Sequence, residues 1–249
     1  MTDAPSALVT GRRTVLEAIR AGIASEVLVV SSARSTEGLR DVLAAARVAG
    51  ARVREVDRAE LDRIAPDHHG VIARVRLPEP IGERDLATWP FGGEDLVVVL
   101  DGITDPQNLG AAARSAEAAG AVMLVTRTRR AADVTPAAIR ASAGALLHLP
   151  HARVANIVRA LKRLQENGFT VIGLSEDAGR TVHEEPCPDG RVAIVLGDEG
   201  AGLGRLTKET CDLLVRLPMR GRVASLNASA SLAAALYAFV LPSRAGSGA

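Results

Sequence analysis

The first group of residues that could do chemistry follows Leu96–Leu100, an apolar run typical of a buried strand. A loop with Gly and Pro comes next, and an alanine-rich helix is expected over Asn108–Ala119, with Asn108 at its start and Arg114 in its second turn. Open α/β folds bind ligands at the carboxyl edge of the sheet, where such a loop lies. An amide and a guanidinium there could bind a polar substrate. A helix cap and a surface arginine would explain the same two residues, so the spacing leaves both interpretations open.

The second group follows the strand expected at Val192–Leu196. It is the glycine-rich loop Gly197–Gly204, which also carries Asp198 and Glu199. Glycines allow a backbone to approach a ligand closely. The loop lacks the lysine of a Walker motif, its glycines do not fit the dinucleotide fingerprint, and its two acids would repel a pyrophosphate. These features favour an adenosine ligand without phosphates, of which S-adenosylmethionine is the commonest. A Rossmann oxidoreductase remains the rival interpretation of this loop.

The third group follows the strand expected at Leu213–Leu217. A loop with two arginines leads to Ser225 and Asn227, and a further helix is expected over Leu226–Val240. Ser225 or Asn227 is a natural N-cap for that helix, because a short polar side chain can accept a hydrogen bond from its first turn. The two arginines suit either RNA contact or a solvated surface.

These loops must be positioned by a larger framework, and the pattern along the chain predicts two domains. The 249 residues alternate short apolar runs with helical periodicity, which favours an α/β fold with a parallel sheet covered by helices. Proline and glycine gather between residues 78 and 94, as in a linker. We therefore expect domains at 1–77 and 95–243, a linker at 78–94 and a disordered tail at 244–249. Apart from the strands named above, strands are expected at Glu26–Val30, Val53–Val56, Gly70–Val75, Ala121–Thr126 and Thr170–Leu174, and helices at Thr14–Ala21, Leu39–Ala49, Pro136–Ala143 and Val154–Asn167.

The composition argues against several classes of protein. Aromatic residues make up 2% of the chain, so base-stacking platforms are not expected, and the net charge of +1 requires any RNA contact to come from local arginines. The two cysteines lack metal-ligand spacing, and the histidines offer no chelating pair, so neither a disulfide framework, a zinc site nor any other metal is expected. A reducing, cytoplasmic compartment fits this cysteine usage. No apolar run is long enough to span a membrane.

Taken together, the three loops resemble the signature motifs of the SpoU (TrmH) family of RNA ribose 2′-O-methyltransferases, in sequence, order and separation. The resemblance extends to Gly11–Ile19 and to Asp67–Ala73, which are similar to the substrate-recognition domain of the bacterial members that methylate a guanosine in 23S ribosomal RNA. Nearly the whole chain is covered.

The resemblance implies a carboxyl-terminal SPOUT domain with a deep trefoil knot, a small amino-terminal α/β domain similar to a ribosomal protein, and a homodimer. It also implies S-adenosylmethionine as cofactor, bound largely through the backbone, and no metal. Gly197, Leu217 and Leu226 match the cofactor-binding positions. Five residues match the catalytic and substrate-positioning residues of the family: Asn108, Arg114, Glu199, Ser225 and Asn227.

Within this family, Arg114 is the expected contact for the ribose. An arginine is effectively always protonated, so a role in orienting the ribose and stabilising a developing alkoxide is favoured over proton abstraction. Glu199 is expected to orient Arg114 or its partner groups, while Ser225 and Asn227 hold the ribose.

Three alternatives stay open at this stage: a member acting on transfer RNA, a member acting on an antibiotic-binding loop of ribosomal RNA, and a catalytically silent RNA-binding assembly factor. The leading domain and the neutral tail favour ribosomal RNA, and the retained polar residues argue against a silent protein.

Overall fold

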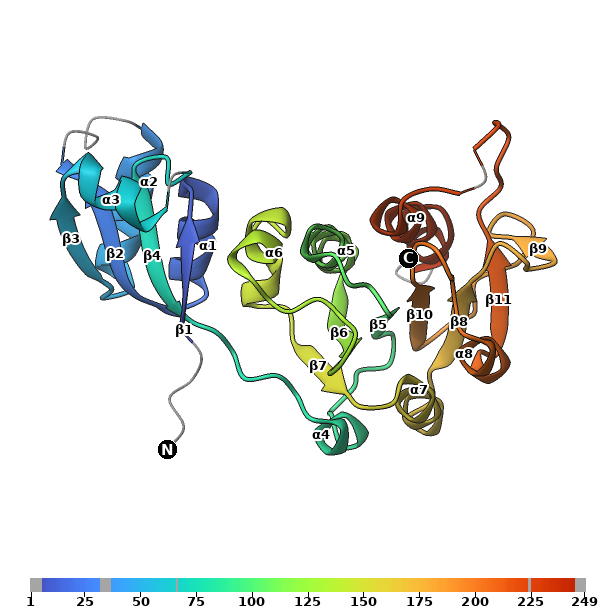
Figure 1. Ribbon diagram of the computed structural model, residues 1–249. Coiled ribbons are helices and arrows are strands. Elements are labelled where there is room, and N and C mark those ends of the chain that lie inside the picture. Colours follow the sequence, from blue (N-terminus) through green and yellow to red (C-terminus); the bar gives the residue numbers. More distant parts are fainter. Residues whose placement is uncertain (1–5, 32–36, 66, 224, 245–249) are drawn as a thin grey trace. The chain divides into compact units, whose positions relative to one another are not determined.

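The computed structural model describes residues 6–31, 37–65, 67–223 and 225–244, and these form two compact units (Figure 1). Unit 1 contains the chain up to Glu79 together with Val134–His148. Unit 2 contains Pro80–Asp133 and the chain from Leu149 onward. The chain therefore passes from one unit to the other three times.

Unit 1 is built on a mixed four-stranded sheet in the order β1-β4-β2-β3. The strands β2 and β3 are parallel and the other pairs are antiparallel. Alternating apolar residues of the central strands, such as Val27, Val29 and Val71, are fully buried against the helices. The elements are β1 (Ser6–Thr10), α1 (Arg12–Arg20), β2 (Ala24–Val30), α2 (Glu37–Val48), β3 (Arg52–Val56), α3 (Arg58–Ile64) and β4 (Val71–Arg76).

The segment Val134–His148 packs within unit 1, although it lies far along the chain. Its helix α6 (Pro136–Ala141) begins at Thr135, whose hydroxyl accepts a hydrogen bond from Ala138, and a 3-10 turn follows. The side chains of Ile139 and Leu147 are buried in the core of unit 1. At Gly144, which has φ of +97°, an added Cβ would lie 2.8 Å from the Cβ of Glu17. Only glycine allows this close approach.

Unit 2 is built on a seven-stranded sheet in the order β7-β6-β5-β10-β8-β11-β9. Every neighbouring pair is parallel, so the predicted parallel α/β sheet is confirmed. The central strands β5 and β10 are buried along their whole length, as a strand covered on both faces requires. The strands are β5 (Leu96–Asp101), β6 (Ala121–Arg127), β7 (His151–Val154), β8 (Thr170–Leu174), β9 (Arg180–Thr181), β10 (Val192–Gly197) and β11 (Leu213–Arg216).

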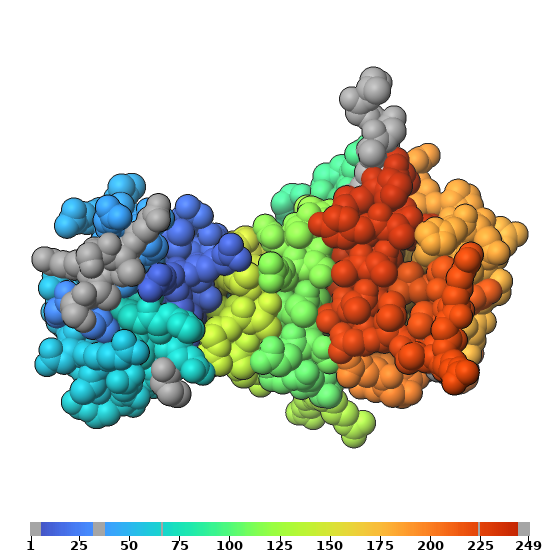
Figure 2. Space-filling view, turned by 90° about the horizontal axis from the view of Figure 1, so that it is seen from above, coloured from blue at the N-terminus to red at the C-terminus, as the bar shows by residue number. Residues whose placement is uncertain are grey.

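Helices cover this sheet and connect its strands. They are α4 (Glu83–Ala87), α5 (Pro106–Ala118), α7 (Ile157–Glu166), α8 (Arg205–Thr210), α9 (Ala228–Ala235) and α10 (Leu241–Arg244), with a π turn at Leu236–Val240. The helix expected over Leu226–Val240 thus begins two residues later and changes its hydrogen-bond pattern near its end. Helices α5 and α9 are more than 100 positions apart and pack side by side, as the adjoining green and red segments in Figure 2 show.

Residues 78–94 do not form the extended linker that their prolines and glycines predict. They contain α4, and the side chain of Leu86 is fully buried in the core of unit 2. Ile81 pairs with the edge strand β7, and the carboxylate of Glu83 binds the guanidinium of Arg159. The prolines and glycines lie outside the short helix, so they do not interrupt it. The apolar side chains between them provide the contacts.

The tail expected to be disordered falls almost entirely outside the described residues, and Arg244 ends α10. Among the described helices, none combines the length and the apolar character needed to cross a bilayer.

Candidate functional site

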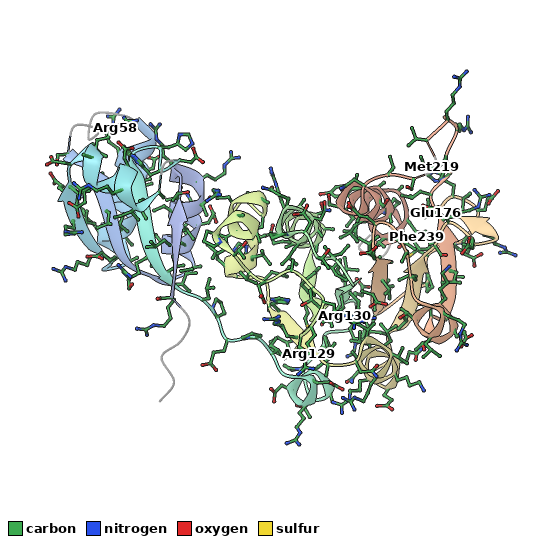
Figure 3. All side chains as sticks on the ribbon, viewed as in Figure 1. Arg58, Arg129, Arg130, Glu176, Met219 and Phe239 are labelled. Atoms are coloured by element: carbon green, nitrogen blue, oxygen red, sulfur yellow. The ribbon has the colours of Figure 1, made fainter. Side chains whose placement is uncertain are left out.

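A cavity of about 430 Å³ lies in unit 2, where the loops after β8, β10 and β11 meet. Parallel strands end at the same edge of a sheet, so these three loops are brought together although they are distant in sequence. Glu176 and Met219, labelled in Figure 3, come from the loops after β8 and β11. The lining includes all three residues predicted to bind the cofactor, Gly197, Leu217 and Leu226, and also Glu199 and Ser225.

The glycine-rich loop returns on itself directly beside the end of β10. A Cβ added to Gly197 would lie 2.2 Å from the carbonyl carbon of Gly202 and 2.4 Å from the amide nitrogen of Leu203. Asp198 and Gly202 exchange backbone hydrogen bonds of 3.2 and 2.9 Å, which close the loop. No other residue type fits at position 197 without moving this backbone.

The carboxylate of Asp198 is used inside this loop. Its Oδ1 accepts hydrogen bonds from the amides of Gly200 and Ala201, at 2.9 and 3.1 Å. These two backbone hydrogen bonds lower the pKa of Asp198 below its ordinary value. The carboxylate therefore holds the turn in place.

Three of the predicted catalytic residues form one hydrogen-bonded cluster. Oε1 of Glu199 accepts from Nδ2 of Asn108 at 2.8 Å and from Nδ2 of Asn227 at 2.5 Å. Nδ2 of Asn227 also donates to Oδ1 of Asn108 at 2.9 Å, and the amide of Ala228 donates to Glu199 at 3.3 Å. The three loops identified from sequence thus converge on one carboxylate oxygen. Hydrogen bonds to a charged acceptor are stronger than neutral ones, so this cluster fixes the loops against one another.

The helix caps differ in part from those expected. Asn108 does not cap α5, because the helix begins two residues earlier at Pro106 and the side chain of Asp105 accepts from the amide of Gln107. Asn108 instead lies in the first turn and is 8% exposed. Asn227 caps α9, as expected: its Oδ1 accepts from the amides of Ser229 and Ala230. One side chain therefore serves both the helix and the cluster.

Arg114 lies apart from this cluster. It is the ninth residue of α5, in the third turn instead of the second, and its side chain is exposed. It makes no hydrogen bond or ion pair with the described residues, so Glu199 does not orient it within one chain. Ser225 lines the cavity with an exposed side chain.

Sequence reasoning missed a buried carboxylate at the end of β5. Asp101, which is 4% exposed, accepts a hydrogen bond from Oγ1 of Thr207 at 2.7 Å and from Nε of Arg127 at 2.6 Å. Its backbone is also in register with Gly197 on the neighbouring strand β10. Through its strand, Asp101 thus fixes the start of the glycine-rich loop. Through its side chain, it fixes α8, the helix that follows the loop. A charged residue that ends an apolar strand was the only signal in the sequence.

The lining of the cavity combines glycine backbone, apolar side chains and carboxylates with two cations, Lys208 and Arg216, and it can hold an adenosine ligand. Glycine backbone and the side chains of Leu196, Leu217 and Leu226 lie beside carboxylates. The lysine on the lining, Lys208, is paired with Asp177 at 2.5 Å. Within the described part of the chain, no group of three or more His, Cys, Asp or Glu side chains could hold a metal ion. Burial raises the pKa of the Cys211 thiol to about 12, so it is no nucleophile.

Comparison with protein families agrees with this geometry. Residues 95–237 match the model of the SpoU rRNA methylase family, and residues 8–81 match a model described as RNA 2′-O ribose methyltransferase substrate binding. The two matches cover most of the chain.

Individual relatives are similar over most of their length. A protein of Photobacterium profundum named 23S rRNA (guanosine-2′-O-)-methyltransferase RlmB is 39% identical over 215 residues, which are 85% of this chain and 87% of that protein. A protein of Mycolicibacterium vanbaalenii named as a tRNA/rRNA methyltransferase is 40% identical over 89% of this chain and 72% of its own. The crystal structure of the SpoU methyltransferase AviRb from Streptomyces viridochromogenes, in complex with AdoMet, has a TM-score of 0.81 at 28% identity and covers 98% of this chain and 93% of that one.

Proposed function

Because the chain belongs to the SpoU rRNA methylase family, we propose that it transfers a methyl group from S-adenosylmethionine to the 2′-hydroxyl of a guanosine ribose in 23S ribosomal RNA. The resemblance predicted from the three loops is confirmed by both family models. The single observation that carries the proposal is the cluster in which Asn108 and Asn227 converge on Glu199 at the rim of the cavity.

S-adenosylmethionine is the methyl donor of this chemistry, and the cavity fits it. Gly197, Leu217 and Leu226 are the residues that would hold it, largely through backbone groups. The carboxylates of Glu176, Asp198 and Glu199 on the lining favour a ligand without phosphates. The cofactor supplies a methyl group already activated on a sulfonium, so no metal is needed.

The residues of the chain then have to position the ribose oxygen for the transfer. We assign this task to Asn108, Glu199 and Asn227, whose shared hydrogen bonds fix their orientation before substrate arrives. Ser225, on the lining, would hold the ribose. Arg114 would orient the ribose and its phosphate and stabilise negative charge on the oxygen, because its guanidinium stays protonated.

The position of Arg114 favours a site that is completed by a second copy of the chain. The exposed side chain of Arg114 does not reach the cluster within one chain, and α5 packs against α9, which is followed by the π turn that carries the exposed Tyr237. We propose a homodimer in which α5 of one copy brings Arg114 to the site of the other. A trefoil knot would explain how the loop at 217–226 and the loop after β10 line one cavity. In this proposal residues 1–77 bind RNA and residues 95–243 catalyse, in the cytoplasm where ribosomal RNA is modified.

The decisive experiment is a map of ribose methylation in ribosomal and transfer RNA from cells with and without the gene. Loss of one 2′-O-methyl group in 23S ribosomal RNA is expected. Loss of a transfer RNA methyl group instead would favour the alternative suggested by the name of the M. vanbaalenii relative. If neither RNA changes, the proposal fails.

The role of Arg114 has its own test in purified protein. Arg114→Ala should abolish methyl transfer and leave the Kd for S-adenosylmethionine within about twofold of wild type, because the residue does not line the cavity. Loss of cofactor binding would contradict the assignment.

A further inference from the structure

We infer that Arg129 and Arg130, on the loop after β6, bind the phosphate backbone of the RNA strand beside the target ribose. This inference rests on the proposed function and adds a contact surface in unit 2 that is separate from the cofactor cavity. Figure 3 labels both arginines.

The loop after β6 lies at the same edge of the sheet as the glycine-rich loop. Strand β6 ends at Arg127 and runs parallel to β5, which in turn runs parallel to β10. Residues 128–130 therefore emerge at the same carboxyl edge as the glycine-rich loop, two strand positions away, with about 5 Å between neighbouring strands. An RNA strand that places one ribose at the cavity must carry its neighbouring phosphates across this edge.

The loop is held in one conformation. The amide of Ala132 donates to the carbonyl of Ile103 at 2.8 Å, which ties the loop to the segment leading into α5. Ala132 is 5% exposed, so this anchor is buried. Arg130 has φ of +54°, a left-handed conformation that is uncommon for a residue other than glycine. The surrounding structure imposes this conformation, so the backbone that carries the two exposed arginines is fixed.

The charges around the loop leave the two arginines available to an anion. Asp101 is occupied by Arg127, and Asp133 is paired with Arg153 at 2.8 Å. Arg129 and Arg130 are exposed, and neither makes an ion pair with a described residue. The chain as a whole has a net charge of only +1, so any attraction for RNA must come from local unneutralised guanidinium groups such as these two. Guanidinium groups bind phosphate oxygens through paired N–H donors.

The test compares single variants in steady-state methyl transfer to ribosomal RNA purified from cells that lack the gene. Arg129→Gln and Arg130→Gln should each raise the KM for RNA several-fold, with kcat and the KM for S-adenosylmethionine unchanged. Each should also reduce the slope of log KM against log salt concentration, measured between about 50 and 200 mM, by about 0.7 to 0.9, the contribution of one phosphate contact. Lys162→Gln, which removes one exposed charge in the middle of α7, is the matched control and should leave both quantities unchanged.

Two further variants separate phosphate binding from a structural role. Arg129→Lys and Arg130→Lys keep the charge and should recover most of the salt slope, because the counterion term depends on charge. Unchanged KM and slope in the Gln variants of an active wild-type enzyme would overturn the inference and leave the proposed function intact. A wild-type enzyme that methylates no RNA would refute the proposed function itself.

Discussion

Gly197→Ala should weaken the binding of the cofactor while the rest of unit 2 stays folded. The added methyl group would lie 2.2 to 2.4 Å from three backbone atoms of Gly202 and Leu203. An ordinary carbon contact begins near 3.4 Å, so strand end and loop must separate by about 1 Å. Such overpacking costs about 1 to 3 kcal/mol.

The strain is relieved most easily by the loop, since β10 is held on both sides by β5 and β8. If the full cost opposes the binding-competent loop, the Kd for S-adenosylmethionine rises by about 5-fold to 150-fold. Isothermal titration calorimetry measures this Kd, and the KM for the cofactor in methyl transfer provides an independent value.

Gly200→Ala is the matched control within the same loop. A Cβ at this position meets only Oδ1 of Asp198, at 3.5 Å, which is ordinary contact, and the φ of Gly200 is not positive. This variant should bind the cofactor within about twofold of wild type. If Gly197→Ala does the same at unchanged Tm, then the loop does not need glycine at 197 and the packing explanation is wrong.

Three other predictions follow from polar contacts. Asn227→Asp places a second carboxylate beside Glu199, so it should lower stability by about 1 kcal/mol at pH 7, and lowering the pH should restore part of the loss; an unchanged Tm across pH would refute this. Thr207→Val removes the hydroxyl bound to Asp101 and should raise the KM for S-adenosylmethionine several-fold at constant kcat, whereas Thr207→Ser should match wild type. Burial first, and the charge of a neighbouring arginine second, lower the pKa of His151 to about 4. Because the unfolded chain binds that proton more tightly, stability should fall as the pH drops from about 6.5 to about 4, by about 2 kcal/mol at pH 5; urea unfolding of His151→Gln should lack this loss.

The long apolar runs made much of unit 2 predictable. Leu96–Leu100 and Val192–Leu196 each match a central strand within one residue. A strand buried on both faces is a continuous apolar run, which is easily recognised in the sequence. The two edge strands, β7 and β9, were harder. Strand β7 has the sequence HARV, in which only alternate residues are buried, and the sequence pattern did not reveal it.

The convergence of the three loops was also predictable, because parallel strands must end at a common edge. The partner of each side chain was not. Asp101 and Thr207 are 106 positions apart, and no local pattern connects a buried carboxylate to one hydroxyl among many. The position of Arg114 outside the cluster follows from the regular helix: Asn108 and Arg114 are six residues apart, about 1.7 turns, so their side chains lie on different faces of α5.

The return of Val134–His148 to unit 1 limits how this protein can be dissected. A fragment that stops near residue 79 would expose to water the apolar surface that Ile139 and Leu147 cover in the intact chain. Such a fragment should aggregate or lose stability, and a synthetic peptide spanning 134–148 should rescue it in trans. Excising the same fifteen positions from unit 2 would require a short bridge between Asp133 and Leu149. A gene for unit 1 alone would have to join two segments that are separate in the chain, the one up to Glu79 and Val134–His148.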